Sequence, residues 1–309
     1  MNRFMKPNAR PNMLSAKILS TLTLVLIYCF AYAQVEYPNL SYASTIHQKA
    51  GFTNFRVDYE RPMQRGRPIF GGLVPYGKPW KTGGGFHNRI SFDTDILVEG
   101  THIKKGTYHL VTIPDPKEWK IILTTDNLVF EKNKPYEKGK EVMRISRKPE
   151  RAPRHYEAFT IDIDIVNNDA VFVFSWDYTS VRFQVSTGTT RLLMTQIRKL
   201  MASNTAAGED YARAAEFIAF NINGLNNTAQ DTLMLLTKKA IALQKDEQME
   251  GWMLEVKADL YKSTGDLKKL EGITKERIAH IKRHPSNEAD KEILQIQEEF
   301  ERYKKAWAN

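Results

Sequence analysis

Residues 158–177 read AFTIDIDIVNNDAVFVFSWD, and this stretch decides the fold class. Apolar side chains recur at every second position on both sides of the central VNNDA, which is the period of a half-buried strand. Asn and Asp between two such runs are typical of a turn. We therefore predict an antiparallel hairpin, with Trp176 on the same core-facing side as Phe172 and Phe174.

The same alternation extends outward, from about Thr45 to Val185. Its other runs are FRVDYE, TYHLVTI, EWKIILTT and VRFQV, and the segments between runs include EGTHIKKG and IPDPKE. The segment FSWDYTSVRFQV is typical of a strand, a tight turn and a second strand. Many short antiparallel strands with little helix between them predict a β-sandwich, which we assign to residues 34–187.

After the last strand the pattern changes to the spacing of amphipathic helices, beginning with TRLLMTQIRKLMAS. Further helices are predicted at 212–221, 229–243, 249–263, 267–283 and 288–307. One hairpin is similar to a tetratricopeptide repeat in its small and aromatic residues, which are Trp252, Ala258, Tyr261 and Gly265. An unrelated antiparallel bundle explains these residues equally well. Residues 188–309 are thus predicted to form an all-α domain of helical hairpins.

The N-terminus has the three-part pattern of a secretory signal. Basic residues precede the apolar run ILSTLTLVLIYCF, and the tripeptide AYA follows, with small residues at Ala31 and Ala33. The apolar run is shorter than the roughly 20 residues that span a bilayer comfortably. We predict cleavage after Ala33 and a periplasmic or secreted protein. The alternative is an uncleaved segment that would be the chain's contact with a membrane.

Cleavage would change two properties of the chain. Residues 1–33 contain four basic and no acidic side chains, so their removal lowers the formal net charge from +9 to +5. The single cysteine, Cys29, leaves with them, so the mature chain has no thiol for a disulfide, a nucleophile or a metal site. The modest charge, the exported compartment and the lack of a known binding motif predict no nucleic-acid partner.

Residues 61–85, RPMQRGRPIFGGLVPYGKPWKTGGG, combine Gly and Pro with basic and aromatic side chains. Gly permits positive φ and Pro fixes φ, so this run must turn several times between strands. Its first part, up to Tyr76, is best explained as a structural corner. From Trp80 onward a ligand site is an equal alternative, because loops on rigid scaffolds often hold sites. Arginine suits carboxylate or phosphate, and aromatic rings suit a sugar. The ligand-binding candidates are Arg67, Tyr76, Trp80, Lys81, Thr82, His87 and Asn88.

Four motifs of the β half are more specific than its periodicity. They are VDYERP, GRPIFGGLVPYGKPWKTG, the block IKKGTYHLVTIP with EWKII, and FSWDYTSVRFQV. Through them, residues from about Ser44 to Val185 resemble a bacterial family of exported proteins known as domain of unknown function 2911. The resemblance implies an exported β domain, often with a helical extension, and implies no activity. After the Trp-x-Thr-Gly turn relatives read Ala-Asn-Glu-Ala-Thr, whereas this chain has Gly85 and Phe86 in place of the Asn and Glu.

Signatures of catalysis and of metal binding are weak in this sequence. It contains no Gly-x-Ser-x-Gly elbow and no Ser-x-x-Lys motif. Asp162 and Asp164 share one face of a strand, but their alternation with isoleucines predicts that this face is exposed to solvent. His280 and His284 share one face of a helix, and a cationic helix C-terminus explains them without a metal. We predict no metal site and no cofactor.

The predicted function is binding rather than catalysis. A helical array presents a concave surface for a protein partner, and the β half has no coherent catalytic constellation. We therefore expect a non-catalytic binding or interaction protein of the bacterial periplasm or cell surface, with a protein or an envelope glycan as its partner. The alternative is an enzyme that acts on a carbohydrate or cell-envelope substrate at the loop Trp80–Arg89. The oligomeric state is left open.

Overall fold

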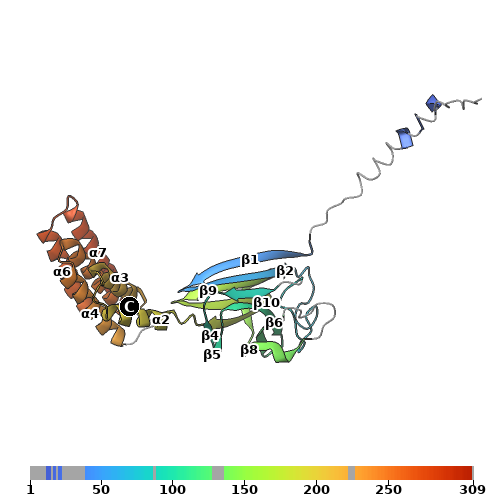
Figure 1. Ribbon diagram of the computed structural model, residues 1–309, viewed down its shortest axis with the longest axis horizontal. Helices are drawn as coiled ribbons and strands as arrows, with labels where there is room; N and C mark the ends of the chain where they lie inside the picture. Colours follow the sequence, from blue (N-terminus) through green and yellow to red (C-terminus); the bar gives the residue numbers. More distant parts are fainter. Residues whose placement is uncertain are drawn as a thin grey trace, which may run out of the picture. The chain divides into compact units, whose positions relative to one another are not determined.

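The computed structural model has antiparallel strands followed by helices, as predicted. Figure 1 shows the strands β1–β10 in blue to green and the helices α2–α7 in yellow to red. The structure describes residues 12–14, 17–18, 20–22, 39–85, 88–126, 136–221 and 227–307. By its internal contacts the chain divides into residues 1–42 and residues 43–309. Cys29 and the predicted cleavage site at Ala33 lie outside the described residues. The helices among the described residues are each too short or too polar to span a membrane.

Six strands form one sheet in the order β1-β2-β3-β6-β7-β8. They are β1 (Ser41–Ala50), β2 (Thr53–Pro62), β3 (Arg89–Phe92), β6 (Gly106–Ile113), β7 (Trp119–Thr124) and β8 (Glu141–Arg147), the last preceded by the 3-10 helix η1 (Lys138–Lys140). The pairings from β2 through β8 are antiparallel. The predicted alternation is visible in β2, where Phe55, Val57 and Tyr59 are buried and the residues between them are more exposed.

The hairpin predicted at residues 158–177 is present, but its strands are longer than the sequence pattern indicates. Strand β9 (Glu150–Val166) pairs antiparallel with β10 (Asp169–Val185), and Phe172 lies opposite Ile163. Asp162 and Asp164 are exposed, as predicted. A third, small sheet pairs β4 (Ile96–Val98) with β5 (Thr101–Ile103).

The prediction of a tight turn within FSWDYTSVRFQV is wrong. Residues 169–185 form one continuous strand, and its register against β9 shifts on both sides of Asp177. Asp177 has φ of 54° and pairs with Tyr156, and the extra residues at both register shifts lie in β9. The segment DYTS therefore continues along β9 opposite a bulged partner strand. Pairing with a long neighbouring strand, which local sequence does not reveal, outweighs the turn propensity of this segment.

One apolar core connects the six-stranded sheet with β9 and β10. Its largest side chains are aromatic, and Trp176, Phe55 and Phe159 are each no more than 1% exposed. The rings meet edge to face, as between Phe55 and Phe172 with centroids 5.6 Å apart. Trp176 therefore is a core anchor, as predicted. The strand pairings establish the antiparallel sheets, and closure of these sheets into a sandwich stays a prediction.

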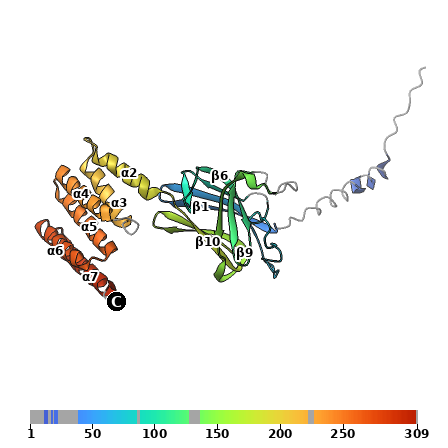
Figure 2. The ribbon, with the colours of Figure 1, turned by 90° about the horizontal axis from the view of Figure 1, so that it is seen from below.

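Six helices follow the sheets. They are α2 (Thr189–Met201), α3 (Gly208–Asn221), α4 (Asn227–Leu243), α5 (Glu247–Thr264), α6 (Leu267–Arg283) and α7 (Ala289–Trp307). Neighbours in the chain from α3 to α7 contact each other, α3 also contacts α5, and Figure 2 shows these helices side by side. Alanines such as Ala212, Ala215 and Ala240 are fully buried, which lets the helix backbones approach closely.

The helix ends follow from local sequence. Gly265 adopts φ of 72° after α5, a left-handed conformation that favours glycine. Asp266 then caps α6, since its carboxylate accepts a hydrogen bond of 3.0 Å from the backbone N–H of Lys269. Asp246 caps α5 in the same way through Met249. These caps define the antiparallel pair α5–α6.

Candidate functional site

The corner between β2 and β3 begins as a compact turn. Backbone N–H groups of Leu73 and Val74 donate to the carbonyls of Pro68 and Ile69, at 3.0 and 2.8 Å. Ile69 and Val74 are buried in the core of the β domain. Gly71 lies in this turn with φ of 87°, which a side chain would strain. The first part of residues 61–85, up to Tyr76, is therefore a structural corner in which Gly and Pro fix the backbone conformation, as predicted.

Arg67 is exposed and its guanidinium is bound to its own corner. Its Nε donates to the carbonyl of Gln64 at 2.9 Å, and its Nη2 donates to the carbonyl of Met63 at 2.6 Å. These hydrogen bonds close the loop that begins at the end of β2. Binding a ligand carboxylate through this side chain would require the guanidinium to exchange partners.

Trp80 lies at the edge of the β-domain core. Its backbone N–H and C=O both bond to Thr112 of β6, at 2.7 and 2.9 Å. Its ring stacks on Trp176 with centroids 5.7 Å apart and meets the edge of Phe159 at 5.1 Å. Trp80 thus packs with the core anchor, and the structure gives this ring a scaffold role.

Thr82 and Asn88 are buried polar side chains that hold the end of the corner. Thr82 has φ of 57° and donates from Oγ1 to Oγ1 of Thr112 at 3.0 Å. Asn88 accepts a hydrogen bond from the backbone N–H of Glu60 at 3.2 Å and donates to the carbonyl of Lys81. The side chain of Lys81 is partly buried, and His87 lies outside the described residues. Asn88 thereby ties the loop to β2.

A carboxylate that sequence reasoning missed lies beside this loop. Gly85 has φ of 50°, and a Cβ atom placed on it would overlap the carboxylate of Glu60. A glycine at this position therefore leaves room for Glu60. The run of glycines marks the place in the sequence, but only the fold shows which side chain fills it.

Tyr76 lines a groove with a volume of about 310 Å³. The groove is lined by Phe70, Tyr76, Asp115, Pro116, Trp119, Pro149, Glu150, Arg151, Tyr178 and Thr179. The ring of Tyr76 lies against Gly71, where a Cβ atom would come within 2.6 Å of it. Phe70 and Trp119 meet edge to face with centroids 4.8 Å apart. The aromatic groove, as we call this surface, thus combines exposed rings with packed ones.

Tyr178 comes to the aromatic groove from the stretch of β10 that lies opposite the bulged part of β9. It follows Asp177, whose left-handed backbone interrupts the strand register, and its side chain is 46% exposed. The guanidinium of Arg151 lies 4.8 Å from the centre of the Tyr178 ring, and the His155 ring lies 5.1 Å from it. His155 also contacts Gln64 through Nε2 at 2.6 Å. A bulge that redirects one aromatic side chain is common next to functional sites.

The fold thus separates the predicted site residues. Among them, Tyr76 alone lines the aromatic groove, while Trp80, Thr82 and Asn88 have partners within the scaffold. The partners of Tyr76 that sequence reasoning missed are Tyr178, Trp119 and Arg151. The signal for Tyr178 is an aromatic residue in the polar segment DYTS, but the composition of this segment favours a turn.

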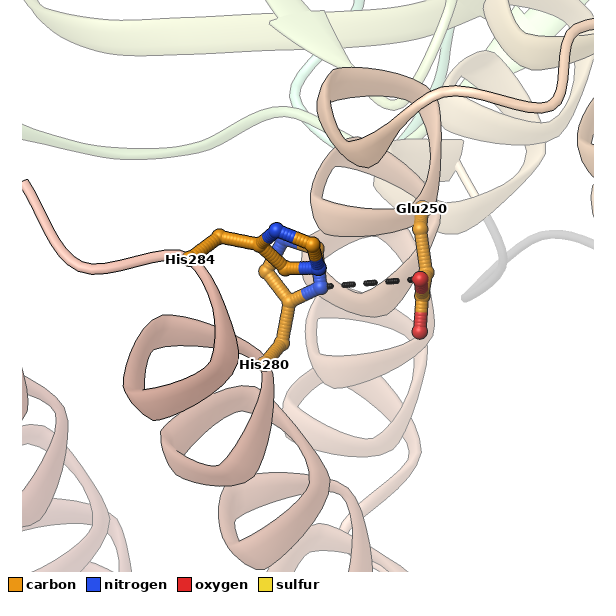
Figure 3. Close-up of side chains that lie close together, drawn as sticks. All are labelled: Glu250, His280 and His284. Atoms are coloured by element: carbon orange, nitrogen blue, oxygen red, sulfur yellow. Dashed lines mark ion pairs between the residues drawn. The ribbon is translucent and has the colours of Figure 1, made fainter.

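A second group of polar side chains lies in the helices, at the end of α6. His280 and His284 have ring centroids 5.0 Å apart, and Glu250 of α5 faces them. Figure 3 shows the ion pair between His280 and Glu250, in which His280 Nδ1 lies 3.8 Å from Glu250 Oε2. Arg283 donates to Glu250 Oε1 at 2.6 Å, which holds the pKa of Glu250 below its usual value against the opposing effect of burial. Sequence reasoning found both histidines and missed the carboxylate that the neighbouring helix supplies.

Comparison with known proteins gives one finding, a similarity of the β domain to a family. No curated protein matches this chain, and no solved structure matches it. Residues 41–185, from the start of β1 to the end of β10, match the family described as Protein of unknown function (DUF2911). The match covers a little under half of the chain and ends before the helices. The β domain, which holds the aromatic groove, is therefore similar to this family of unknown function over its whole described length.

Proposed function

We propose that the protein is an exported, non-catalytic binding protein of the bacterial periplasm or cell surface, and that its β domain binds the sugar rings of an envelope glycan. The observation that carries this proposal is the aromatic groove, in which the exposed rings of Tyr76 and Tyr178 stand beside Phe70 and Trp119. Ligand sites are concave and largely aromatic, with a small number of polar groups that fix orientation. Asp115, Glu150 and Arg151 supply such groups.

The chemistry of the aromatic groove suits a ligand that is both flat-faced and polar. A sugar ring presents C–H groups on its face, which pack on aromatic side chains, and hydroxyls at its edge, which bond to charged groups. Arg151 lies over Tyr178 and so restricts this ring before any ligand arrives. Restricting side chains in advance lowers the entropic cost of binding.

The scaffold roles in the neighbouring loop favour binding over catalysis. Trp80 packs on Trp176, and Thr82 and Asn88 are bonded to Thr112 and Glu60 within the fold. The alternative, an enzyme that acts on a carbohydrate or cell-envelope substrate at Trp80–Arg89, draws on one observation. The carboxylate of Glu60 lies against Gly85 in that loop and would be its general acid or base.

The helices are proposed to bind a protein partner as tetratricopeptide-like hairpins. Helix α3 contacts both α4 and α5, so the first helix of one hairpin packs on the first helix of the next. The same order places Ala258 and Tyr261 at contacts within the helical core. Such stacking supports a repeat arrangement, which presents an extended surface for another chain.

The glycan proposal is tested by titrating the purified chain with soluble fragments of cell-envelope polysaccharide and following tryptophan fluorescence. Trp119 lines the groove, so a bound sugar should change its emission. We expect Tyr76→Ala and Tyr178→Ala each to weaken binding at least tenfold, since each removes one stacking surface. Phe220→Ala is the matched control, because it removes an aromatic side chain that is 65% exposed in α3. Unchanged affinity in both tyrosine variants would refute the groove, and release of cleaved fragments that stops in Glu60→Gln would establish the enzyme alternative.

Export is tested separately. We expect the chain from periplasmic or secreted fractions to begin at Gln34 when its N-terminus is read by mass spectrometry. A full-length chain retained in the membrane fraction would favour the uncleaved anchor. Recovery of an uncleaved chain from the cytoplasm would contradict export.

A further inference from the structure

The end of α6 brings two imidazoles and one carboxylate together. His280 and His284 are four residues apart, and the backbone N–H of His284 still donates to the carbonyl of His280 at 3.0 Å, so both rings follow the same helical face. Glu250 comes from the first turn of α5. One ligand atom from each of the three residues lies within 4.8 Å of the others. Two neighbouring helices therefore contribute to one cluster.

His280 contributes a nitrogen that has no hydrogen-bond partner. Its side chain is 13% exposed, and its Nδ1 is buried without such a partner among the described residues. The other nitrogen, Nε2, faces the backbone of α5 closely enough that a Cβ atom on Gly251 would lie 3.0 Å from it. Nδ1 is therefore the ligand atom, and it lies on the side of Glu250 Oε2. A buried polar atom without a partner is costly, and a bound cation would remove that cost.

The groups around the cluster orient its ligands. Glu247 Oε2 lies 2.7 Å from Nδ1 of His284, which leaves Nε2 of that ring for a ligand. A carboxylate behind a histidine fixes the tautomer and orientation of the ring at many metal sites. Arg283 occupies Oε1 of Glu250 and leaves Oε2 toward His280. His284 and Glu250 thus each have a second contact that holds the ligand in place.

The spacing of the atoms fits a small divalent ion. Zinc binds imidazole nitrogen and carboxylate oxygen at about 2.0–2.2 Å, so two ligands of one tetrahedral ion lie about 3.4 Å apart. The distance of 3.8 Å between His280 Nδ1 and Glu250 Oε2 is close to this value. The other ligand atoms of the cluster are farther apart, and rotation of an exposed side chain such as His284 can bring them to this spacing. Three protein ligands leave the fourth position of such an ion open to solvent or to a bound group.

We propose that Glu250, His280 and His284 bind a divalent transition-metal ion and thereby clamp α5 to α6. Two imidazoles with one carboxylate select zinc and its neighbours in the first transition row over magnesium and calcium, which take oxygen ligands. His280 also lines a cleft of about 730 Å³ among α5, α6 and α7, whereas Glu250 and His284 do not line it. This site is independent of the aromatic groove and of the proposed glycan.

The test uses the full exported chain without a polyhistidine tag, stripped of metal with a chelator. Zinc is titrated against a chromophoric indicator, and Co²⁺ is added separately because its visible absorption reports coordination. We expect one ion per chain and a Co²⁺ spectrum typical of four-coordination. His284→Ala and Glu250→Gln should each weaken zinc binding at least tenfold and remove the Co²⁺ spectrum, while the circular dichroism of the helices stays unchanged.

The matched control is His102→Ala. His102 pairs with Asp95 at 3.5 Å, and among the described residues no third metal-ligating side chain joins them. His102 therefore has an ion pair like that of the cluster but too few ligands for a metal site. We expect this variant to bind zinc as the parental chain does. Zinc binding that is lost in His102→Ala, that survives the His284→Ala and Glu250→Gln double variant, or that does not saturate at one ion per chain would overturn the site. Arg283→Gln gives a second check, because loss of the guanidinium that holds Glu250 Oε1 should weaken zinc binding, but less than Glu250→Gln does.

Discussion

The β domain and the helices are stabilised by different side chains. In the β domain large rings fill much of the buried volume. The ring of Trp80 contacts those of Trp119 and Trp176, and the ring of Trp176 contacts that of Phe159. In the helices aliphatic side chains take the place of most rings, and several buried positions are alanines, such as Ala240 and Ala258, which are fully enclosed. The sheets therefore need side chains that fill space between layers, whereas the helices need positions that let backbones approach.

A second difference lies in the use of charge. The β-domain core is apolar, but the pair α6–α7 is joined to α5 by a partly buried ionic group. Glu299 accepts hydrogen bonds from Lys262 and Arg277, both at 3.0 Å, and both cationic side chains are less than 15% exposed. The apolar cluster beside them is small, consisting of Leu254, Ala258, Leu270 and Ile273. The C-terminal helices thus rely on electrostatics where the β domain relies on burial.

The largest expected effect tests the aromatic core. Trp176→Ala removes a ring that is 1% exposed and contacts Trp80 and Phe159. We expect the free energy of unfolding of the β domain to fall by about 3–5 kcal/mol, the cost of large cavities in cores. Urea denaturation followed by tryptophan fluorescence measures it. Phe220→Ala, at an exposed position of α3, should change stability by less than about 0.5 kcal/mol. A similar loss in both variants would break the contrast.

The next effect tests the small residues of the helices. Ala240→Leu forces extra volume between α4 and its neighbours, where Ala240 is fully buried. Overpacking of this kind costs about 1–3 kcal/mol. Ala242→Leu adds the same side chain on the exposed face of the same helix and should cost little. Both are measured by thermal unfolding at 222 nm. Equal melting temperatures for the two variants would show that the helices tolerate larger residues in their core.

The ionic group of the C-terminal helices is expected to contribute less. Glu299→Gln keeps the shape of the side chain and removes the charge between Lys262 and Arg277. Hydrogen bonds to charged groups contribute about 1.5–3 kcal/mol when buried, and partial exposure reduces this to about 1–2 kcal/mol here. Glu271→Gln, which breaks an exposed pair with Lys275, is the control and should have no measurable effect. If the two variants lose equal stability, burial adds nothing to the Glu299 pairs.

The same residue predicts a dependence on pH. Burial raises the pKa of Glu299, but the hydrogen bonds from Lys262 and Arg277 outweigh it and leave the pKa below the usual value. Glutamate in the unfolded chain titrates near about 4.3. Because the folded pKa is the lower one, the stabilisation is complete above the unfolded pKa and is lost as pH falls through the folded pKa. The stability difference between the parental chain and Glu299→Gln should therefore shrink from about pH 6 to about pH 3. A difference that stays constant over this range would contradict the assignment.

The smallest effect concerns a helix cap. Asp266→Ala removes the acceptor for the backbone N–H of Lys269 at the start of α6. Loss of such a cap costs about 1 kcal/mol. Asp266→Asn keeps an acceptor in the same place and should recover most of the loss in the same thermal unfolding measurement. A variant with Asn that is as unstable as the variant with Ala would show that charge, rather than the cap, matters at this position.

Local signals explain why some elements could be predicted to the residue. Helix α6 has the predicted bounds, 267–283, because Gly265 and Asp266 stop one helix and cap the next. Helix α3 begins at Gly208, four residues before its predicted start. Glycine is a poor helix former, yet Asp210 accepts a hydrogen bond from the backbone N–H of Ala207 at 2.9 Å and so caps this early start.

The parts of the site that could not be predicted depend on contacts far apart in sequence. Tyr76 and Tyr178 belong to segments about 100 residues apart and meet because the corner after β2 and the irregular stretch of the β9–β10 pair open onto one groove. Glu250 meets His280 only because α5 and α6 are antiparallel. Periodicity identifies which face of an element is buried, but it does not identify which exposed faces converge.

Asp177 links the stability of the β domain to the direction of a single side chain. A left-handed conformation is free of cost for glycine, and this chain instead holds it with an aspartate. Pairing along the long β9–β10 ladder offsets this cost and fixes the direction of the next side chain, Tyr178, which lines the aromatic groove. Glycine at this position would relax the backbone and leave the direction of Tyr178 less fixed, so a more stable strand would hold a less ordered aromatic groove.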